Sequence, residues 1–389
     1  MQSTKLLALS FIALFSSLLA RPANAATYEW YGTNGVWSAS TNWVNGVSPS
    51  AGGSASDSLL FGSTPGEIYT ANNDLGGTFV VNELILSNTL VGTVQTNSGN
   101  QLQFDGVGAQ IAHKGTAGFR VSNDINIVNG LTVTGNGSGQ LTLAGQISGS
   151  GPVVKSGTHT TVITGNNTYT GGTAINGGSV IVNNTSGSGL GSGNVTINNA
   201  TLTGTGTVSG NVAVNSGGVL AGTLTVGDVV VGNGGVFAPG SKITSTSTTW
   251  QGGGEYAWSI ANTLTGAGIG WDLASINGTL SIQSSLATPF LIAVSGTPAN
   301  FNTLGAYSFA IATASGGISG FDESKFQLDV SGFGISTPVG ARWWVSNVGN
   351  SIYVNYAIPE PSTIFLFAAG VTLIGIPQAR KFWQRRTRR

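Results

Sequence analysis

The sequence predicts an all-β protein: a right-handed parallel β-helix, then a smaller antiparallel β domain and a short C-terminal transmembrane helix. Apolar residues alternate with Thr, Ser and Asn, as in Leu141-Thr142-Leu143, and this period of two is typical of strands. Gly accounts for 61 of the 389 residues. Gly/Asn pairs separate the alternating stretches about every ten residues, as turns would.

Charge is scarce and unevenly placed. Charged residues make up only 7% of the chain, and between residues 26 and 358 six Lys/Arg stand against thirteen Asp/Glu, a net of −7. An acidic body argues against nucleic acid and anionic membranes as partners. The chain contains no Cys, which excludes disulfides and thiolate chemistry.

Low charge suits a parallel β-helix in particular. Its coils stack ~4.8 Å apart, so side chains at equivalent positions form ladders. Like charges at that spacing repel by ~0.9 kcal/mol per pair even in water. Thr and Asn ladders can hydrogen-bond instead, and Gly permits tight corners. We therefore expect the solenoid over residues 45–245, with about ten coils of about 20 residues each.

The N-terminus has the layout of a Sec signal peptide. Lys5 precedes an apolar run over residues 6–20, and Ala23 and Ala25 form an A-x-A cleavage site. The alternative is an N-terminal anchor or a core helix. We expect residues 1–25 to pass the chain to the Sec translocon and to be removed.

The C-terminus, residues 358–389, has three parts in a fixed order. An apolar stretch, 364–376, would span ~20 Å as a helix, shorter than a ~30 Å hydrocarbon core. A short span with a basic end suits transient inner-membrane insertion, with the positive end in the cytoplasm. The motif before the stretch is Pro359, Glu360, Pro361, Ser362 and Thr363. The basic tail after it contains Arg380, Lys381, Arg385, Arg386, Arg388 and Arg389.

This arrangement resembles the PEP-CTERM sorting signal, in which Pro-Glu-Pro, a short apolar helix and an Arg-rich tail close the chain. The resemblance implies processing near Pro359-Glu360-Pro361 by an exosortase, in a bacterium that makes exopolysaccharide. It also implies that the mature form lies at the cell surface or in the extracellular matrix. The alternative is an ordinary single-pass tail with a chance Pro-Glu-Pro.

A second resemblance lies within the expected solenoid. Residues 165–173 read Gly-Asn-Asn-Thr-Tyr-Thr-Gly-Gly-Thr, within a strand-turn-strand stretch over 149–182. This resembles the autotransporter-associated β-strand repeat, which implies a parallel β-helix. We expect Tyr169 to pack against a neighbouring coil, and either Gly171 or Gly172 to adopt a positive φ.

The two ends of the body differ from its middle. Residues 26–44 contain Trp30, Trp37 and Trp43, and we expect them to form an aromatic cap on the first coil of the solenoid. The alternative is that these rings offer stacking faces to a sugar. Residues 246–357 carry larger alternating side chains, and we expect them to form the separate antiparallel β domain.

No constellation of catalytic residues is evident, and we expect neither an enzyme nor a cofactor or metal site. His113 and His159 are lone and far apart in the sequence, and the cluster of Asp322, Glu323, Lys325 and Asp329 is typical of a solvated loop. The other acids are scattered singly: Asp57, Glu67, Asp74, Glu83, Asp105, Asp124, Asp228, Glu255 and Asp272.

Three functional hypotheses follow. The first is an exported structural protein of the surface or matrix, with exopolysaccharide or other matrix components as partners. The second is a carbohydrate-binding adhesin that uses Trp30, Trp37 and Trp43. The third is a polysaccharide-active β-helix enzyme, which would need carboxylates gathered in a groove.

Overall fold

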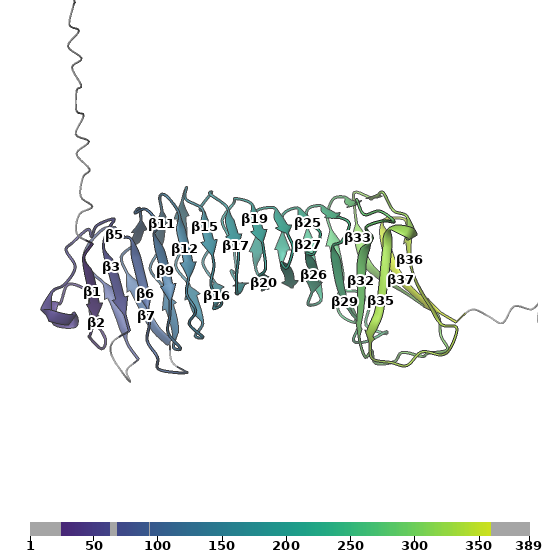
Figure 1. The fold of residues 1–389 in the computed structure, drawn as a ribbon, viewed down its shortest axis with the longest axis horizontal. Helices are drawn as coiled ribbons and strands as arrows, with labels where there is room; N and C mark the ends of the chain where they lie inside the picture. The colour runs from purple at the N-terminus through teal and green to yellow at the C-terminus, as the bar shows by residue number, and fades with distance from the viewer. Residues whose placement is uncertain (1–24, 63–67, 93, 359–389) are drawn as a thin grey trace, which may run out of the picture.

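A computed structural model describes residues 25–62, 68–92 and 94–358. These residues form an elongated stack of short strands, in which the chain advances along one axis from the N-terminal end to the C-terminal end (Figure 1). The described residues include no helix that is both long and apolar enough to span a membrane. The expected signal peptide up to residue 24, the Pro-Glu-Pro motif, the transmembrane helix and the basic tail lie outside the described residues.

Two long parallel sheets run the length of the stack, each with 13 strands. The first contains β1 (Thr27–Trp30), β3 (Ser58–Phe61), β6 (Glu83–Leu86), β9 (Gln110–His113), β12 (Leu131–Thr134), β15 (Val153–Lys155), β17 (Thr173–Ile175), β19 (Val195–Ile197), β22 (Val212–Val214), β25 (Val229–Val231), β28 (Thr248–Trp250), β31 (Leu280–Ile282) and β34 (Ile318–Ser319). The second contains β2 (Gly35–Val36), β4 (Thr70–Asn73), β7 (Val94–Gly99), β10 (Gly118–Val121), β13 (Leu141–Leu143), β16 (Thr160–Ile163), β18 (Ser179–Val182), β20 (Thr201–Gly204), β23 (Val219–Gly222), β26 (Val236–Pro239), β29 (Glu255–Ser259), β32 (Phe290–Gly296) and β35 (Phe326–Phe333).

Two shorter sheets form a third side of the stack. One has 4 strands: β5 (Phe79–Val81), β8 (Leu102–Phe104), β11 (Ile125–Ile127) and β14 (Ile147–Gly149). The other has 7: β21 (Thr207–Val208), β24 (Thr225–Val226), β27 (Lys242–Ser245), β30 (Leu273–Ile276), β33 (Tyr307–Ala314), β37 (Ser351–Ala357) and β36 (Arg342–Val348). Three short 3₁₀ helices complete the described elements: η1 (Ser40–Asn42), η2 (Val44–Gly46) and η3 (Glu323–Lys325). The expectation of an all-β protein with a parallel solenoid is confirmed.

The core is built by in-register stacking of inward-facing residues. Ile175, Ile197, Val214 and Val231 are partners on successive strands of the first sheet, and all four are fully buried. Alternate residues on these strands face outward, which is why the period of two predicted them. Each coil therefore buries its apolar face against its two neighbours rather than against a distant element.

A ladder of amides runs along the outside of the same sheet. The side-chain Nδ2 of Asn198 donates to Oδ1 of Asn176 at 2.8 Å, and Nδ2 of Asn215 donates to Oδ1 of Asn198 at 2.8 Å. An uncharged amide donates to one neighbour and accepts from the other, so the ladder satisfies itself. A row of like charges could not do so.

The expected limits of the solenoid, residues 45 and 245, are wrong. At the N-terminal end β1 already pairs in parallel with β3, Thr27 opposite Ser58, so the stack begins at residue 27. At the other end β28 pairs in parallel with β31, and β29 with β32, so the sheets continue across residue 245. The alternation of a strand shows which face is buried but not which strand lies beside it.

The separate antiparallel domain expected over 246–357 is therefore a continuation of the solenoid. Antiparallel pairing among its strands is confined to β37, which lies between β33 and β36. Here the chain turns back on itself at the last coil, and the β36–β37 hairpin splays away from β35 (Figure 1).

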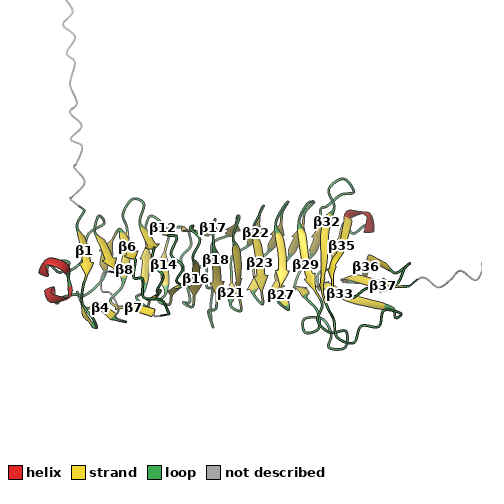
Figure 2. Ribbon diagram, turned by 60° about the horizontal axis from the view of Figure 1, so that its bottom comes forward, coloured by secondary structure: helices red, strands yellow, loops and turns green. Residues whose placement is uncertain are grey.

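The two ends of the stack are finished differently. At the N-terminal end η1 and η2 lie over the first strands, and the backbone N–H of Tyr31 donates to the carbonyl of Asn42 at 2.8 Å (Figure 2). At the C-terminal end β35 is the last strand of its sheet and β36 the last of the fourth sheet.

Candidate functional site

The turn between β16 and β17 is held by side chains that reach both neighbouring coils. Asn167 is 3% exposed; its Oδ1 accepts from the N–H of Ile147 at 2.7 Å, and its Nδ2 donates to the carbonyl of Gly189. Tyr169 is 1% exposed, and its hydroxyl lies 2.6 Å from the Thr173 hydroxyl. The turn is thus pinned to the coil before it and the coil after it.

Two glycines make this turn sterically feasible. Gly172 has φ +80°, which L side chains rarely adopt. Gly171 has an ordinary φ, but a Cβ there would lie 2.4 Å from the carbonyl carbon of Gly151. The expectations that Tyr169 packs between coils and that one of the two glycines has a positive φ are both confirmed.

Residues 153–182 match the family model of the passenger-associated-transport-repeat. The matched segment begins at β15 and ends at β18, so the repeat is two successive long-sheet strands of one coil, the turn described above, and the corresponding strands of the next. No curated protein matches the chain. A passenger-associated-transport-repeat built into a β-solenoid indicates an exported surface protein.

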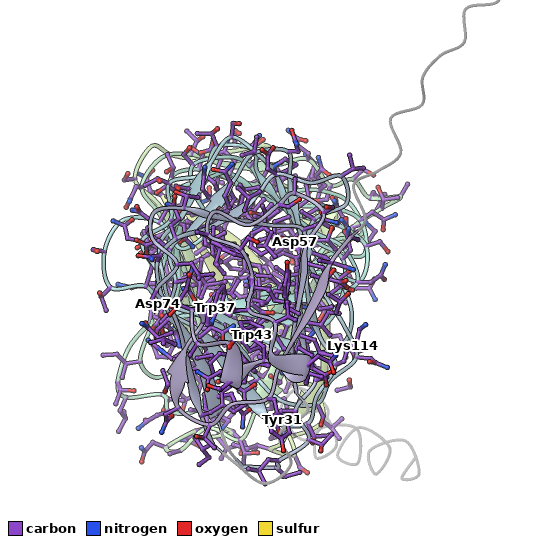
Figure 3. All side chains as sticks on the ribbon, turned by 90° about the vertical axis from the view of Figure 1, so that its left-hand side faces the viewer. Tyr31, Trp37, Trp43, Asp57, Asp74 and Lys114 are labelled. Atoms are coloured by element: carbon purple, nitrogen blue, oxygen red, sulfur yellow. The ribbon has the colours of Figure 1, made fainter. Side chains whose placement is uncertain are left out.

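The three N-terminal tryptophans are interior residues. Trp30 and Trp37 are 0% exposed and Trp43 is 2% exposed. The Trp30 and Trp43 rings meet edge to face at 5.2 Å, and the Trp43 Nε1–H donates to the carbonyl of Trp37 at 2.7 Å. In the end-on view Trp37 and Trp43 lie toward the middle of the cross-section and Tyr31 at its margin (Figure 3). Buried rings offer no face to a sugar, so the alternative stacking role of these three residues is wrong.

Two histidines described above as lone meet inside the solenoid. The rings of His113 and His159 lie 5.4 Å apart and both side chains are buried. The Nδ1 of His159 lies 3.2 Å from the carbonyl of Gly135, on the coil between them, and its Nε2 lies 3.1 Å from the Thr161 hydroxyl. As a neutral ring with the proton on Nδ1, His159 satisfies both contacts.

Lys155 completes this interior polar cluster. Its Nζ donates to the carbonyls of Ser156, Gly157 and Gly177 at 2.9, 3.2 and 3.1 Å, which uses all three ammonium donors. Burial lowers the pKa of Lys155 to about 8. The signal for this residue was present in the sequence, since alternation in β15 places Lys155 on the same face as the buried Val153.

The histidines are held in their neutral form. Burial, and secondarily the positive charge of Lys155, lower the pKa of His159 to about 4, and burial also lowers the pKa of His113. Among the described residues no group of three or more His, Cys, Asp or Glu side chains could hold a metal ion. The cluster is therefore an interior polar feature held by hydrogen bonds to backbone carbonyls.

Several acids along the solenoid bind its backbone, and two of them, Asp124 and Asp228, connect neighbouring coils. Oδ1 of Asp124 accepts from the N–H of Gln146 at 2.8 Å, and Oδ1 of Asp228 accepts from the N–H of Ser247 at 3.1 Å. Asp272 is 4% exposed and its Oδ2 accepts from both the N–H and the hydroxyl of Ser259. These carboxylates satisfy backbone donors at coil corners, a structural use of charge.

The open C-terminal end carries a concave site that the sequence did not indicate. A groove of about 590 Å³ lies there, between the β35 side of the last coil and the hairpin strand β36. It is lined by Asp322, Glu323, Ser324, Phe326, Leu328, Trp343, Trp344 and Val345. Asp322, Glu323 and Asp329 are exposed, as expected of a solvated cluster. The expected loop is wrong for Asp329, which lies within β35, and the sequence did not indicate that Asp322 and Glu323 line a groove.

Proposed function

We propose that this chain is a non-enzymatic structural protein that is exported through the Sec translocon, sorted by an exosortase and displayed at the cell surface or in an exopolysaccharide matrix. The observation that carries the proposal is the passenger-associated-transport-repeat at 153–182, folded as part of one continuous solenoid. The composition of the two termini adds the route: an A-x-A site at Ala23 and Ala25, and a Pro-Glu-Pro motif followed by an apolar stretch and a basic tail.

The body supports a scaffold role because several of its charged side chains bind its own backbone. Asp124, Asp228 and Asp272 bind backbone donors, and Lys155 binds three carbonyls. A polysaccharide-cleaving site would need a pair of carboxylates placed to act as acid and base on the two sides of a scissile bond. We therefore propose no turnover, and a reducing-sugar assay with the producer's exopolysaccharide checks it: released reducing ends would contradict the proposal.

Cell fractionation with and without the exosortase tests the sorting route. With the enzyme, surface material should begin at Ala26 and end near Pro361 by mass spectrometry; without it, the precursor should accumulate in the inner membrane. The variant Pro359→Ala/Pro361→Ala should behave like the enzyme deletion, whereas Gln384→Ala should behave like the unaltered chain. Surface material that still ends at Arg389 would contradict exosortase processing.

A second candidate function is carbohydrate binding without cleavage. The specific observation that favours it is the groove at the C-terminal end, where aromatic and carboxylate side chains line one concave surface. Trp30, Trp37 and Trp43, the residues first considered for this role, are buried at the other end.

A further inference from the structure

The groove lies where the last coil of the solenoid is incompletely covered. Phe326 and Leu328 belong to β35. Together with Trp343 and Val345 of β36, they form the apolar side of the groove. Phe326 and Leu328 are only partly buried, although their ladder partners on β32, Phe290 and Ile292, are fully buried. The end of the hydrophobic core is therefore accessible in this groove.

Neighbouring rings hold the aromatic wall in place. The Trp343 ring meets Tyr356 at 4.9 Å, and it meets Phe333 at 5.0 Å and 70°. Trp344, the next residue on β36, also lines the groove and is half-buried. Because its neighbours hold it, Trp343 loses little conformational freedom when a ligand binds.

The other wall is anionic. Among the groove-lining residues that the structure describes, the charged ones are Asp322 and Glu323. Oδ1 of Asp322 accepts from the N–H and hydroxyl of Ser324 at 3.0 and 2.9 Å, and these bonds hold the pKa of Asp322 below its usual range. The second oxygen of Asp322 and the Glu323 carboxylate are acceptors for a ligand that brings donors.

We propose that this groove binds a neutral glycan, with a sugar C–H face against Trp344 and the sugar hydroxyls donating to Asp322 and Glu323. Aromatic faces with a few convergent polar groups are the pattern of a small-molecule or chain-binding cleft. Two carboxylates disfavour uronic-acid or sulfated chains by like-charge repulsion. The inference rests on the proposed surface display, which would bring the groove into contact with extracellular polysaccharide.

An extended peptide is the competing ligand class, because β35 ends its sheet and could receive another strand. The observations favour the glycan. A peptide added to the edge of β35 would use its backbone N–H and C=O groups on that strand, and would leave the Asp322 and Glu323 carboxylates to whatever side chains it carried. Sugar hydroxyls present donors in every orientation.

Calorimetric titration of the full chain tests the proposal with three neutral hexasaccharides (cellohexaose, maltohexaose and chitohexaose) and with hexagalacturonic acid. We expect at least one neutral chain to bind with a Kd of about 1 mM or tighter, and the uronic acid to bind more weakly. Trp344→Ala should weaken neutral binding about tenfold or more, since stacking on one ring contributes on that scale. Asp322→Asn/Glu323→Gln should weaken neutral binding and raise affinity for the uronic acid.

Matched controls are available at the opposite end of the molecule. Tyr31→Ala removes a ring that is 61% exposed, and Glu29→Gln removes a carboxylate on β1; neither should change glycan affinity. Absence of binding by all three neutral chains, or binding that survives both groove variants, would overturn the proposal. So would preferential binding of the strand peptide acetyl-KTVTVTVK-amide. Fractionation of the same cells measures surface display independently. A failure of surface display can therefore be distinguished from a failure of glycan binding.

Discussion

The rings of His113 and His159 lie 5.4 Å apart although they sit two coils apart along the solenoid. Stacking brings them together: β9 and β15 flank β12, and Gly135, which directly follows β12, accepts from His159. Interior positions on non-adjacent coils can therefore be coupled electrically, even though each coil packs only on its neighbours.

The burial of His159 predicts a pH dependence of stability. The pKa of His159 is about 4 in the folded state and 6.5 in an unfolded chain, so the unfolded state binds more protons between these values. The free energy of unfolding should therefore fall as the pH falls from 6.5 to 4. The positive charges of Lys155 and His113 also lower the pKa of His159. Asp272 has a pKa raised to about 6, so its own contribution to the free energy of unfolding changes with pH in the opposite direction.

Comparison with a variant isolates the His159 contribution. Urea unfolding at pH 7, 5.5 and 4.5 should show a smaller loss of stability in His159→Gln than in the unaltered chain. Equal losses in the two proteins would contradict the assignment.

Alanine at Gly171 or at Gly172 should destabilise the protein, each by a different mechanism. Gly172→Ala forces a methyl group into φ +80°, and Gly171→Ala places one 2.4 Å from Gly151. Gly108, with φ +70° and open space around it, measures the backbone cost alone, about 1 kcal/mol. We expect both turn variants to lose more than Gly108→Ala in chemical denaturation; a loss equal to that control would count against close coil packing here.

The hydroxyl pair of Tyr169 and Thr173 should show strong coupling. Tyr169→Phe leaves a buried Thr173 hydroxyl without its 2.6 Å partner, a cost of about 1–3 kcal/mol. Thr173→Val in the same chain removes the orphaned group, so the double variant should be more stable than the sum of single losses predicts. A double-mutant cycle with zero coupling would show that the pair does not hold the turn.

Charge placed in the outer amide ladder should respond to salt with opposite signs. Asn198→Asp/Asn215→Asp puts two anions at neighbouring ladder positions, a repulsion of ~0.9 kcal/mol in water, which added NaCl should relieve. Asn198→Asp/Asn215→Lys puts opposite charges there, and NaCl should weaken that variant relative to the unaltered chain. Thermal melts at low and high salt measure the change in melting temperature of each double variant. A change of the same sign in the two variants would rule out a stacked ladder.

Trp37→Ala should unfold the N-terminal coils locally. Loss of a fully buried Trp costs about 3–5 kcal/mol, and in a solenoid the loss falls on neighbouring coils. Hydrogen exchange should accelerate over β1 to β5 and remain unchanged over β22 to β25. Uniform acceleration would mean that the stack unfolds as one cooperative unit.

Sequence patterns predicted the local features of this fold well. Alternation predicted the strands, and Gly-Asn-Asn-Thr-Tyr-Thr-Gly-Gly-Thr predicted the turn. Both were predictable because the conformation of a turn depends on residues that are adjacent in the sequence. Partners across coils were not predictable, because coil length varies: Asn215 bonds Asn198 across 17 residues, whereas Thr279 bonds Ser247 across 32. Without the register, neither the His113–His159 contact nor the groove beside Trp343 could be located.

Because every coil stacks on its neighbours at the same spacing, the length of the solenoid can change without a change in either end. The coil between Asn198 and Asn215 contains 17 residues and contacts its neighbours through ladders that any copy of it would reproduce. Duplicating it would move the two ends apart by about 4.8 Å, the spacing of neighbouring strands, without altering either end. Each coil thus adds a fixed length to the solenoid, and the number of coils sets the distance between the terminal groove and the first strand.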